Sequence, residues 1–152
     1  MFPPHIKFSN FNNSFLIKYE GESKKDIKEG YGIGQYKNGD KYEGEYKNGL
    51  MNGYGTYFFS EGNIYKSGRI NGKMNGYGIY EFRDGDKYQG EIKDNMPDGY
   101  GTSYYSNGDI YEGQWKKGKK DGYGFYYFSK GIKYKGLWKN GNREKIICKL
   151  EY

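Results

Sequence analysis

Residues 111–133 read YEGQWKKGKKDGYGFYYFSKGIK, and this pattern of glycines and aromatic residues returns along most of the 152-residue chain. Residues 42–64 read YEGEYKNGLMNGYGTYFFSEGNI, with tyrosine first, Gly-Tyr-Gly from the twelfth position and another glycine at the twenty-first. The first tyrosine recurs every 23 residues, at positions 19, 42, 65, 88, 111 and 134. A fixed period of this length identifies a repeat protein and defines the boundaries of its repeats.

The period divides the chain into a repeat array, residues 19–141, and two flanking segments. The array consists of repeats 19–41, 42–64, 65–87, 88–110 and 111–133 and a half repeat, 134–141. The end units of a repeat array must cover its last stacking surfaces. We therefore expect residues 1–18 to be an N-terminal cap or a partner-docking segment. Residues 142–152 are expected to be a C-terminal cap or a dimerisation strand.

The composition favours strands over helices. The chain has 26 glycines, 20 tyrosines, 9 phenylalanines and 2 tryptophans, but no alanine or valine and only four leucines. Few of these residues favour a helix, and so many aromatic residues are untypical of a disordered chain. Glycine and aromatic enrichment together predict short strands joined by tight turns.

Each repeat is predicted to form one β-hairpin. Residues 111–116 alternate between large and small or polar side chains, as a strand does, and residues 122–128 form the second strand. The eighth position of every repeat holds Gly, Asn or Asp, the residue types that tolerate positive φ in a turn. We expect the two glycines of Gly-Tyr-Gly to share one face of their strand, where a neighbouring aromatic ring covers their bare backbone. The structural glycines of two repeats are Gly49, Gly53, Gly55, Gly62, Gly118, Gly122, Gly124 and Gly131.

Consecutive hairpins of this kind form a meander, and no segment remains to build a second layer. We predict an all-β fold: an elongated, single-layer, twisted antiparallel β-meander of about 5.5 hairpin repeats. Ladders of aromatic side chains are expected to stabilise it in place of a globular core. About eleven strands at a spacing of about 4.8 Å would give a rod about 50 Å long.

These motifs resemble the MORN (membrane occupation and recognition nexus) repeat family. The resemblance rests on Tyr42-Glu-Gly-Glu-Tyr46, Gly49, Gly53-Tyr-Gly55 and Gly62, and on the same pattern in residues 111–131. It covers residues 19–141. Four positions depart from the pattern: serine replaces a glycine at Ser67, and a non-aromatic residue stands at Ser23, Arg69 and Ile92. We therefore expect a weaker aromatic ladder in repeat 65–87.

The resemblance implies a scaffold rather than an enzyme. Proteins of this family tether to membranes or membrane skeletons, often dimerise, and occur in cytoskeletal, axonemal and junctional assemblies; phosphoinositide binding has been proposed for them. The expected function is a non-enzymatic scaffold that mediates protein–protein interaction and tethers a partner to a membrane-associated or cytoskeletal structure. One alternative is a structural subunit of an axonemal or other large assembly without lipid contact. Another is a module that binds anionic lipid or single-stranded nucleic acid.

The positive charge lies mainly at the C-terminal end. The formal net charge is +6, to which residues 42–110 contribute −3 and residues 111–152 contribute +7. Clustered lysines attract anionic lipid headgroups, at about 1 kcal/mol for each charge. The candidate anion- or lipid-binding residues are Lys116, Lys117, Lys119, Lys120, Lys133 and Lys135. The alternative is that these lysines keep an aromatic-rich rod soluble and prevent edge-to-edge pairing. Nucleic acid is a less favoured partner, because packing alone explains aromatic residues that recur at fixed positions.

A protein partner or a second copy of the chain is expected to contact exposed apolar residues. The half repeat lacks its second strand, so residues 134–139 would have an unpaired edge unless residues 144–152 fold back or another molecule covers it. A two-fold homodimer would cover that edge. The candidate interface residues are Trp115, Trp138, Ile146, Ile147, Leu150, Phe8 and Phe11.

No combination of residues indicates catalysis or a cofactor. His5 and Cys148 are the only residues of their types, so neither a catalytic triad nor a metal cluster can be assembled around them. We expect no enzyme activity, no cofactor and no metal. One cysteine and an N-terminus without a basic start and apolar run lead us to expect a cytoplasmic protein, with peripheral association with a membrane or the cytoskeleton as an option.

Overall fold

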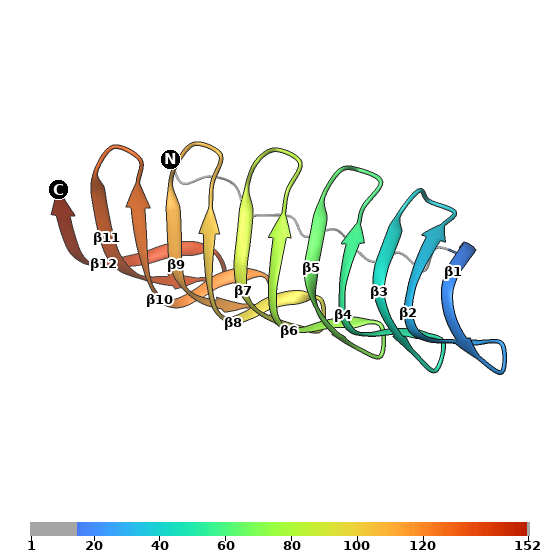
Figure 1. The fold of residues 1–152 in the computed structure, drawn as a ribbon. Coiled ribbons are helices and arrows are strands. Elements are labelled where there is room, and N and C mark those ends of the chain that lie inside the picture. Colours follow the sequence, from blue (N-terminus) through green and yellow to red (C-terminus); the bar gives the residue numbers. More distant parts are fainter. Residues whose placement is uncertain (1–14, 152) are drawn as a thin grey trace.

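The computed structural model describes residues 15–151, and in this range the chain forms a 12-stranded antiparallel sheet without a helix. The strands neighbour one another in chain order (Figure 1). They are β1 (Leu16–Lys24), β2 (Ile27–Tyr36), β3 (Lys41–Lys47), β4 (Leu50–Phe58), β5 (Ile64–Ile70), β6 (Lys73–Glu81), β7 (Lys87–Lys93), β8 (Met96–Tyr104), β9 (Ile110–Lys116), β10 (Lys119–Phe128), β11 (Ile132–Lys139) and β12 (Asn142–Glu151). The predicted all-β meander is confirmed. It has one strand more than expected, because β12 pairs with β11.

Two-residue turns join each odd-numbered strand to the next strand. Both residues of each turn have positive φ, as at Asn48 (50°) and Gly49 (79°). Such a pair suits the type I′ turn, whose twist matches that of the flanking strands. The prediction for the eighth position is confirmed at Asp26, Gly49, Gly72, Asn95, Gly118 and Gly141. The structure adds that the seventh position has positive φ as well, including at Lys25 and Lys117.

Longer turns join each even-numbered strand to the next one and lie along the top of Figure 1. Hydrogen bonds to side chains link consecutive turns. A polar side chain at the last-but-one position of a repeat accepts a hydrogen bond from a backbone N–H of the following turn. The donors and acceptors are Ser60 and Asp40 (2.8 Å), Arg83 and Asn63 (2.9 Å), Ser106 and Asp86 (2.8 Å), and Ser129 and Asp109 (2.9 Å). This ladder fixes each repeat against its neighbour.

Two of these acceptors also bind buried tyrosines. The hydroxyl groups of Tyr57 and Tyr126 donate to the carboxylates of Asp40 and Asp109, at 2.8 and 2.9 Å. Burial raises the pKa of both tyrosines, and the hydrogen bond to a carboxylate raises it further by a smaller amount. Because a carboxylate accepts strongly, these bonds satisfy polar atoms that would otherwise be costly to bury.

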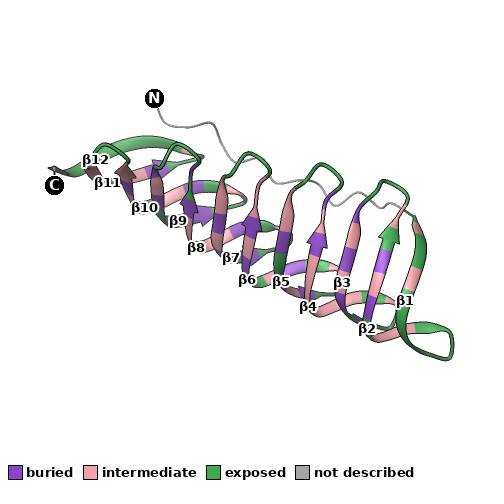
Figure 2. Cartoon of the chain, turned by 45° about the horizontal axis from the view of Figure 1, so that its top comes forward, coloured by how far each residue is buried: buried purple, intermediate pink, exposed green. Residues whose placement is uncertain are grey.

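The core lies on the inner face of the sheet. The strands bend along their length, so the sheet forms a trough (Figure 1). Buried positions alternate with more exposed ones along strands such as β3, β5, β7 and β9 (Figure 2). The first tyrosine of the repeat is fully buried at Tyr42, Tyr65, Tyr88 and Tyr111. Its ring lies against glycines of its own and the next strand, so that a Cβ added at Gly55 would overlap the ring of Tyr42. The predicted ring cover is confirmed for the second glycine of Gly-Tyr-Gly.

The prediction was wrong for the first glycine of Gly-Tyr-Gly. Gly53 has a φ of +63° and lies where the register between β3 and β4 shifts, which is a β-bulge. A Cβ at Gly53 would meet the carboxylate of Glu45 rather than a ring. The extra residues of a bulge rotate the backbone, so the two glycines do not present the same face.

A buried arginine takes the place of an aromatic residue in repeat 65–87. The guanidinium of Arg69 lies 5.2 and 5.1 Å from the ring centroids of Tyr42 and Tyr57, and it donates a hydrogen bond to the carbonyl of Gly72 (3.0 Å). Burial lowers the pKa of Arg69. A planar cation can stack on aromatic faces, and Arg69 therefore continues the packing of the trough where the repeat departs from its pattern.

Candidate functional site

The central tyrosine of each Gly-Tyr-Gly motif is exposed on the outer face of the sheet. These five residues, the central tyrosines of the Gly-Tyr-Gly motifs, form what we call the outer tyrosine row: Tyr31, Tyr54, Tyr77, Tyr100 and Tyr123. Their side chains are between 56% and 75% exposed. Neighbouring members are two strands apart, so they follow one another at about 9.6 Å along the sheet. The row is a regular aromatic surface that the core does not use.

A polar side chain on the preceding strand fixes the backbone at four members of the row. The backbone N–H groups of Tyr31, Tyr54, Tyr100 and Tyr123 donate to Glu22 (3.0 Å), Glu45 (3.1 Å), Glu91 (3.0 Å) and Gln114 (2.7 Å). Repeat 65–87 has Gly68 at this position. There the hydroxyl of Tyr77 instead accepts a hydrogen bond from the side chain of Gln89 (2.9 Å). Hydrogen bonds thus fix four members of the row at the backbone and Tyr77 at its hydroxyl.

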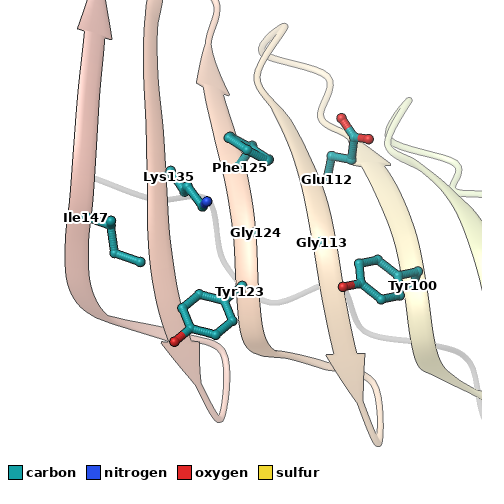
Figure 3. Close-up of a pocket in the computed structure, with 8 residues that line it drawn as sticks. All are labelled: Tyr100, Glu112, Gly113, Tyr123, Gly124, Phe125, Lys135 and Ile147. Atoms are coloured by element: carbon teal, nitrogen blue, oxygen red, sulfur yellow. The ribbon is translucent and has the colours of Figure 1, made fainter.

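A groove of about 550 Å³ lies between the last two members of the row. Tyr100 and Tyr123 border it, and the backbones of Gly113 and Gly124 line it between them (Figure 3). Its other lining residues are Glu112, Phe125, Lys135 and Ile147. Two residues predicted from the sequence, Lys135 and Ile147, thus meet beside the outer tyrosine row, which sequence reasoning missed.

Two lysines of β11 give this end of the outer face a positive charge. The ammonium group of Lys133 lies 4.4 and 4.6 Å from the ring centroids of Phe125 and Tyr127, and that of Lys135 lies 5.8 Å from Phe125. Stacking of this kind holds a cation beside an aromatic face without neutralising it. The predicted candidates Lys133 and Lys135 therefore combine charge and aromatic surface.

The remaining candidate lysines do not form one cluster with these two. Lys116, Lys117 and Lys119 are exposed at the turn between β9 and β10. In the strand register, Lys133 and Lys135 pair with Tyr127 and Phe125, several residues away from that turn. The basic C-terminal end thus presents two separate surfaces.

Lys120 is not on either surface, which corrects its assignment as an anion-binding candidate. It is 7% exposed, and its ammonium group lies 4.9–5.0 Å from the ring centroids of Tyr105, Tyr111 and Tyr126. Burial lowers the pKa of Lys120 to about 8, although the nearby Asp109 carboxylate acts in the opposite direction. Its side chain points into the trough and cannot reach a membrane surface.

The predicted interface residues differ in their exposure. Trp115 and Trp138 are buried, and their rings pack edge-on against Tyr111 at 5.4 and 5.0 Å, so they contribute to the core and are not available to a partner. Ile146 and Ile147 are 41% and 48% exposed on β12, which is an edge strand. Phe8, Phe11 and the side chain of Leu150 lie outside the described residues. Homodimerisation through this edge stays a prediction.

Residues 15–151 contain neither a cluster of metal-binding side chains nor a membrane-spanning helix. No group of three or more histidine, cysteine, aspartate and glutamate side chains in this range is arranged to hold a metal ion. The same range contains no helix that is long and apolar enough to cross a membrane.

The family model of the MORN repeat matches residues 19–41, 42–64, 70–87, 88–110, 111–133 and 134–144, and the chain belongs to this family. No curated protein matches the chain. Among solved structures, it is similar to the TCP domain of SAS-4 (dCPAP) of Drosophila melanogaster, which was solved in complex with a proline-rich motif of Ana2 (dSTIL). That likeness has 18% identity and a TM-score of 0.48, and covers 76% of this chain and 70% of the other.

Proposed function

We propose that this chain is a non-enzymatic scaffold that binds a partner protein through the outer face of its sheet. The observation that carries the proposal is the outer tyrosine row, five large aromatic side chains that are 56–75% exposed on a regular sheet. Contiguous exposed aromatic surface is typical of interaction sites. Tyrosine is enriched at interfaces because it combines a large apolar ring with a hydroxyl group.

The difference between the two faces of the sheet supports this proposal. The inner face stabilises the fold through its buried aromatic residues, so nothing in the core requires the outer tyrosines. An array in which each repeat contacts only its neighbours offers an extended surface that one partner can follow over several repeats. Family membership favours a role in which that partner is tethered to a membrane-associated or cytoskeletal structure in the cytoplasm.

The test is to remove the row while preserving the fold. A variant with Tyr54, Tyr77 and Tyr100 changed to serine should keep its strand spectrum and melting temperature, but it should lose the proteins that the unaltered chain captures from extracts of its own cells. The matched control changes three exposed lysines, Lys24, Lys47 and Lys93, to serine. Identical capture by the tyrosine variant and the unaltered chain would contradict the proposal.

A second candidate function is binding to an anionic membrane surface. The observation that favours it is the turn between β9 and β10, where Lys116, Lys117 and Lys119 are all exposed. Each lysine near an anionic surface contributes about 1 kcal/mol, which salt screens. Changing the three lysines to glutamine should then reduce co-sedimentation with phosphatidylserine vesicles by about tenfold or more. Addition of a phosphoinositide to the vesicles tests whether the headgroup or only the charge matters.

The control for the membrane experiment is the pair Lys133→Gln and Lys135→Gln, which removes charge from the other basic surface. Equal loss in both variants would show that net charge alone determines binding. Absence of vesicle binding, together with capture of protein partners, would favour the structural subunit of a large assembly without lipid contact.

A further inference from the structure

We propose that the outer tyrosine row binds a proline-rich segment of a partner protein in the polyproline II conformation. The segment has proline at every third residue and acidic residues at the end that lies over β11. This inference rests on the proposed protein-binding function and specifies the chemistry of the partner at the same surface.

The spacing of the row selects the conformation of the ligand. The tyrosines follow one another at about 9.6 Å, because strands are about 4.8 Å apart and each repeat contributes two. A polyproline II helix has three residues per turn and a rise of about 3.1 Å, so every third residue returns to the same side after about 9.3 Å. Over the five tyrosines the mismatch amounts to roughly 1 Å. Each turn of the ligand can therefore meet one tyrosine.

Other peptide conformations match less well. Seven residues of an α-helix, the number that brings a side chain back near the same side, rise about 10.5 Å, and the mismatch grows to about 4 Å over the row. In a β-strand, residues i and i+2 face the same side, about 6.6 Å apart, and residue i+3 points to the opposite side. Neither keeps one side chain in phase with each repeat.

The local surface suits a proline ring and an extended backbone. Between Tyr100 and Tyr123 the groove runs over the backbones of Gly113 and Gly124, and a proline ring can lie there between two aromatic side chains (Figure 3). Polyproline II has no internal hydrogen bonds, so its carbonyl groups can accept from exposed tyrosine hydroxyls. Aromatic-lined grooves are a recurring way to recognise this conformation.

The charges distinguish the ligand from a nucleic acid strand, which could also stack on a tyrosine row. The carboxylates of Glu45 and Glu91 lie beside Tyr54 and Tyr100, and residues 42–110 have a net charge of −3. A chain of phosphates would be repelled there, whereas a neutral proline-rich segment would not. At the other end, Lys133 and Lys135 form no ion pair within residues 15–151 and can pair with acidic residues of the ligand.

The experiment uses fluorescent peptide pools and the full chain. One pool has proline at every third position, mixed neutral residues between them and three aspartates at one end. The comparison pool has the same composition with proline at every fourth position. We expect saturable binding of the first pool by fluorescence anisotropy and at least tenfold weaker binding of the second. Equal binding of the two pools, or no binding of the first, overturns the inference.

Variants locate the site. Changing Tyr77 and Tyr100 to serine should weaken binding of the first pool at least tenfold, whereas the control Tyr104→Ser, on the outer face outside the row, should leave it unchanged. Lys133→Gln with Lys135→Gln should weaken binding of the aspartate-ended pool and not of the same pool without aspartates. Binding that is unaffected by the Tyr77 and Tyr100 changes overturns the inference, as does binding of a single-stranded oligonucleotide in preference to the pool.

The outcomes separate this inference from the proposed function. If the peptide pool does not bind but loss of the row abolishes capture of cellular proteins, the partner binds the row in another conformation and only the present inference fails. If loss of the row changes neither experiment, the outer face is not a docking surface and both proposals fail.

Discussion

The inner and outer faces of the sheet use the same residue type for opposite purposes. Tyr42 and Tyr54 belong to one repeat, yet Tyr42 is fully buried and Tyr54 is 75% exposed. The ring of Tyr42 fills the space over Gly44 and Gly55, whereas the ring of Tyr54 projects from the outer face. In a single-layer sheet, the strand position of a tyrosine therefore decides whether it stabilises the fold or offers a binding surface.

Both polar and apolar contacts hold the buried first tyrosines of the repeats in place. The hydroxyl of Tyr88 donates to the carbonyl of Glu91 (2.9 Å), and its ring meets Trp115 edge-on at 5.2 Å. Burial raises the pKa of Tyr42 and of Tyr65 to about 12. Tyr42 and Tyr65 therefore stay neutral at pH values at which a tyrosine in water begins to ionise.

Removal of an inner ring should have the largest effect on the free energy of unfolding. Tyr88→Ala should lower the free energy of unfolding by about 3–5 kcal/mol, because it leaves a cavity over two glycines. Tyr77→Ala, on the outer face of the neighbouring repeat, should change it by less than about 1 kcal/mol. Urea unfolding followed by circular dichroism measures both. Similar losses in the two variants would show that the outer ring also belongs to the core.

The glycines under the inner rings should be the next most sensitive positions. A methyl group at Gly55 overlaps the ring of Tyr42, so Gly55→Ala should cost about 3 kcal/mol through overpacking. Gly72 has a φ of +80° and nothing within 4 Å of an added Cβ, so Gly72→Ala should cost only about 1 kcal/mol of backbone strain. Gly72→Asn should cost less again, since Asn95 occupies the same repeat position. An equal or reversed order in the melts would refute the ring-cover explanation.

Much of this comparison could be predicted from the sequence. The 23-residue period and the Gly, Asn or Asp at the eighth position define the hairpins, because backbone conformation limits which residues fit there. The exposure of Tyr54 also follows from alternation, since it faces away from Gly55 and no second layer covers the sheet. The recurring aromatic residues were interpreted as packing, and the outer tyrosine row was therefore missed.

Other features depend on contacts between strands and could not be predicted in the same way. The bulge at Gly53 is held by Glu45, which is brought beside it only when the two strands pair. Lys120 was assigned to the surface because of its charge. Its repeat position is the one that holds Met74 and Pro97, both fully buried, so alignment of the repeats could have indicated an inner position. Residue type alone could not.

Lys120 provides a test of the inner face through pH. Burial lowers its pKa from 10.5 to about 8, so the unfolded chain binds more protons between these values and the stability should rise with pH in that window. We expect the free energy of unfolding to increase by about 1–2 kcal/mol between about pH 7 and about pH 9.5. Lys120→Met should remove this increase. If the free energy of unfolding of the unaltered chain and of Lys120→Met changes equally with pH, Lys120 is not buried as a cation.

The smallest effect is expected from the side chains that fix the outer row. Glu91→Ala removes the acceptor for the backbone N–H of Tyr100 and should cost about 1 kcal/mol or less, because water can replace it at an exposed site. Glu91→Gln should cost almost nothing, since Gln114 makes the equivalent bond in the next repeat. Thermal melts of both variants measure the difference. A larger loss for glutamine than for alanine would show that charge, not hydrogen bonding, matters at this position.

The unbroken order of the strands has a consequence for how the protein is made. Each strand pairs only with its neighbours in the chain, and the hydrogen bonds between consecutive long turns join residues about 20 positions apart. Such a chain has low contact order, so no early segment must wait for a distant one before it can pair. Each hairpin can therefore add to the sheet as it leaves the ribosome, and the growing array exposes one changing edge, that of its most recent strand, besides the fixed edge of β1.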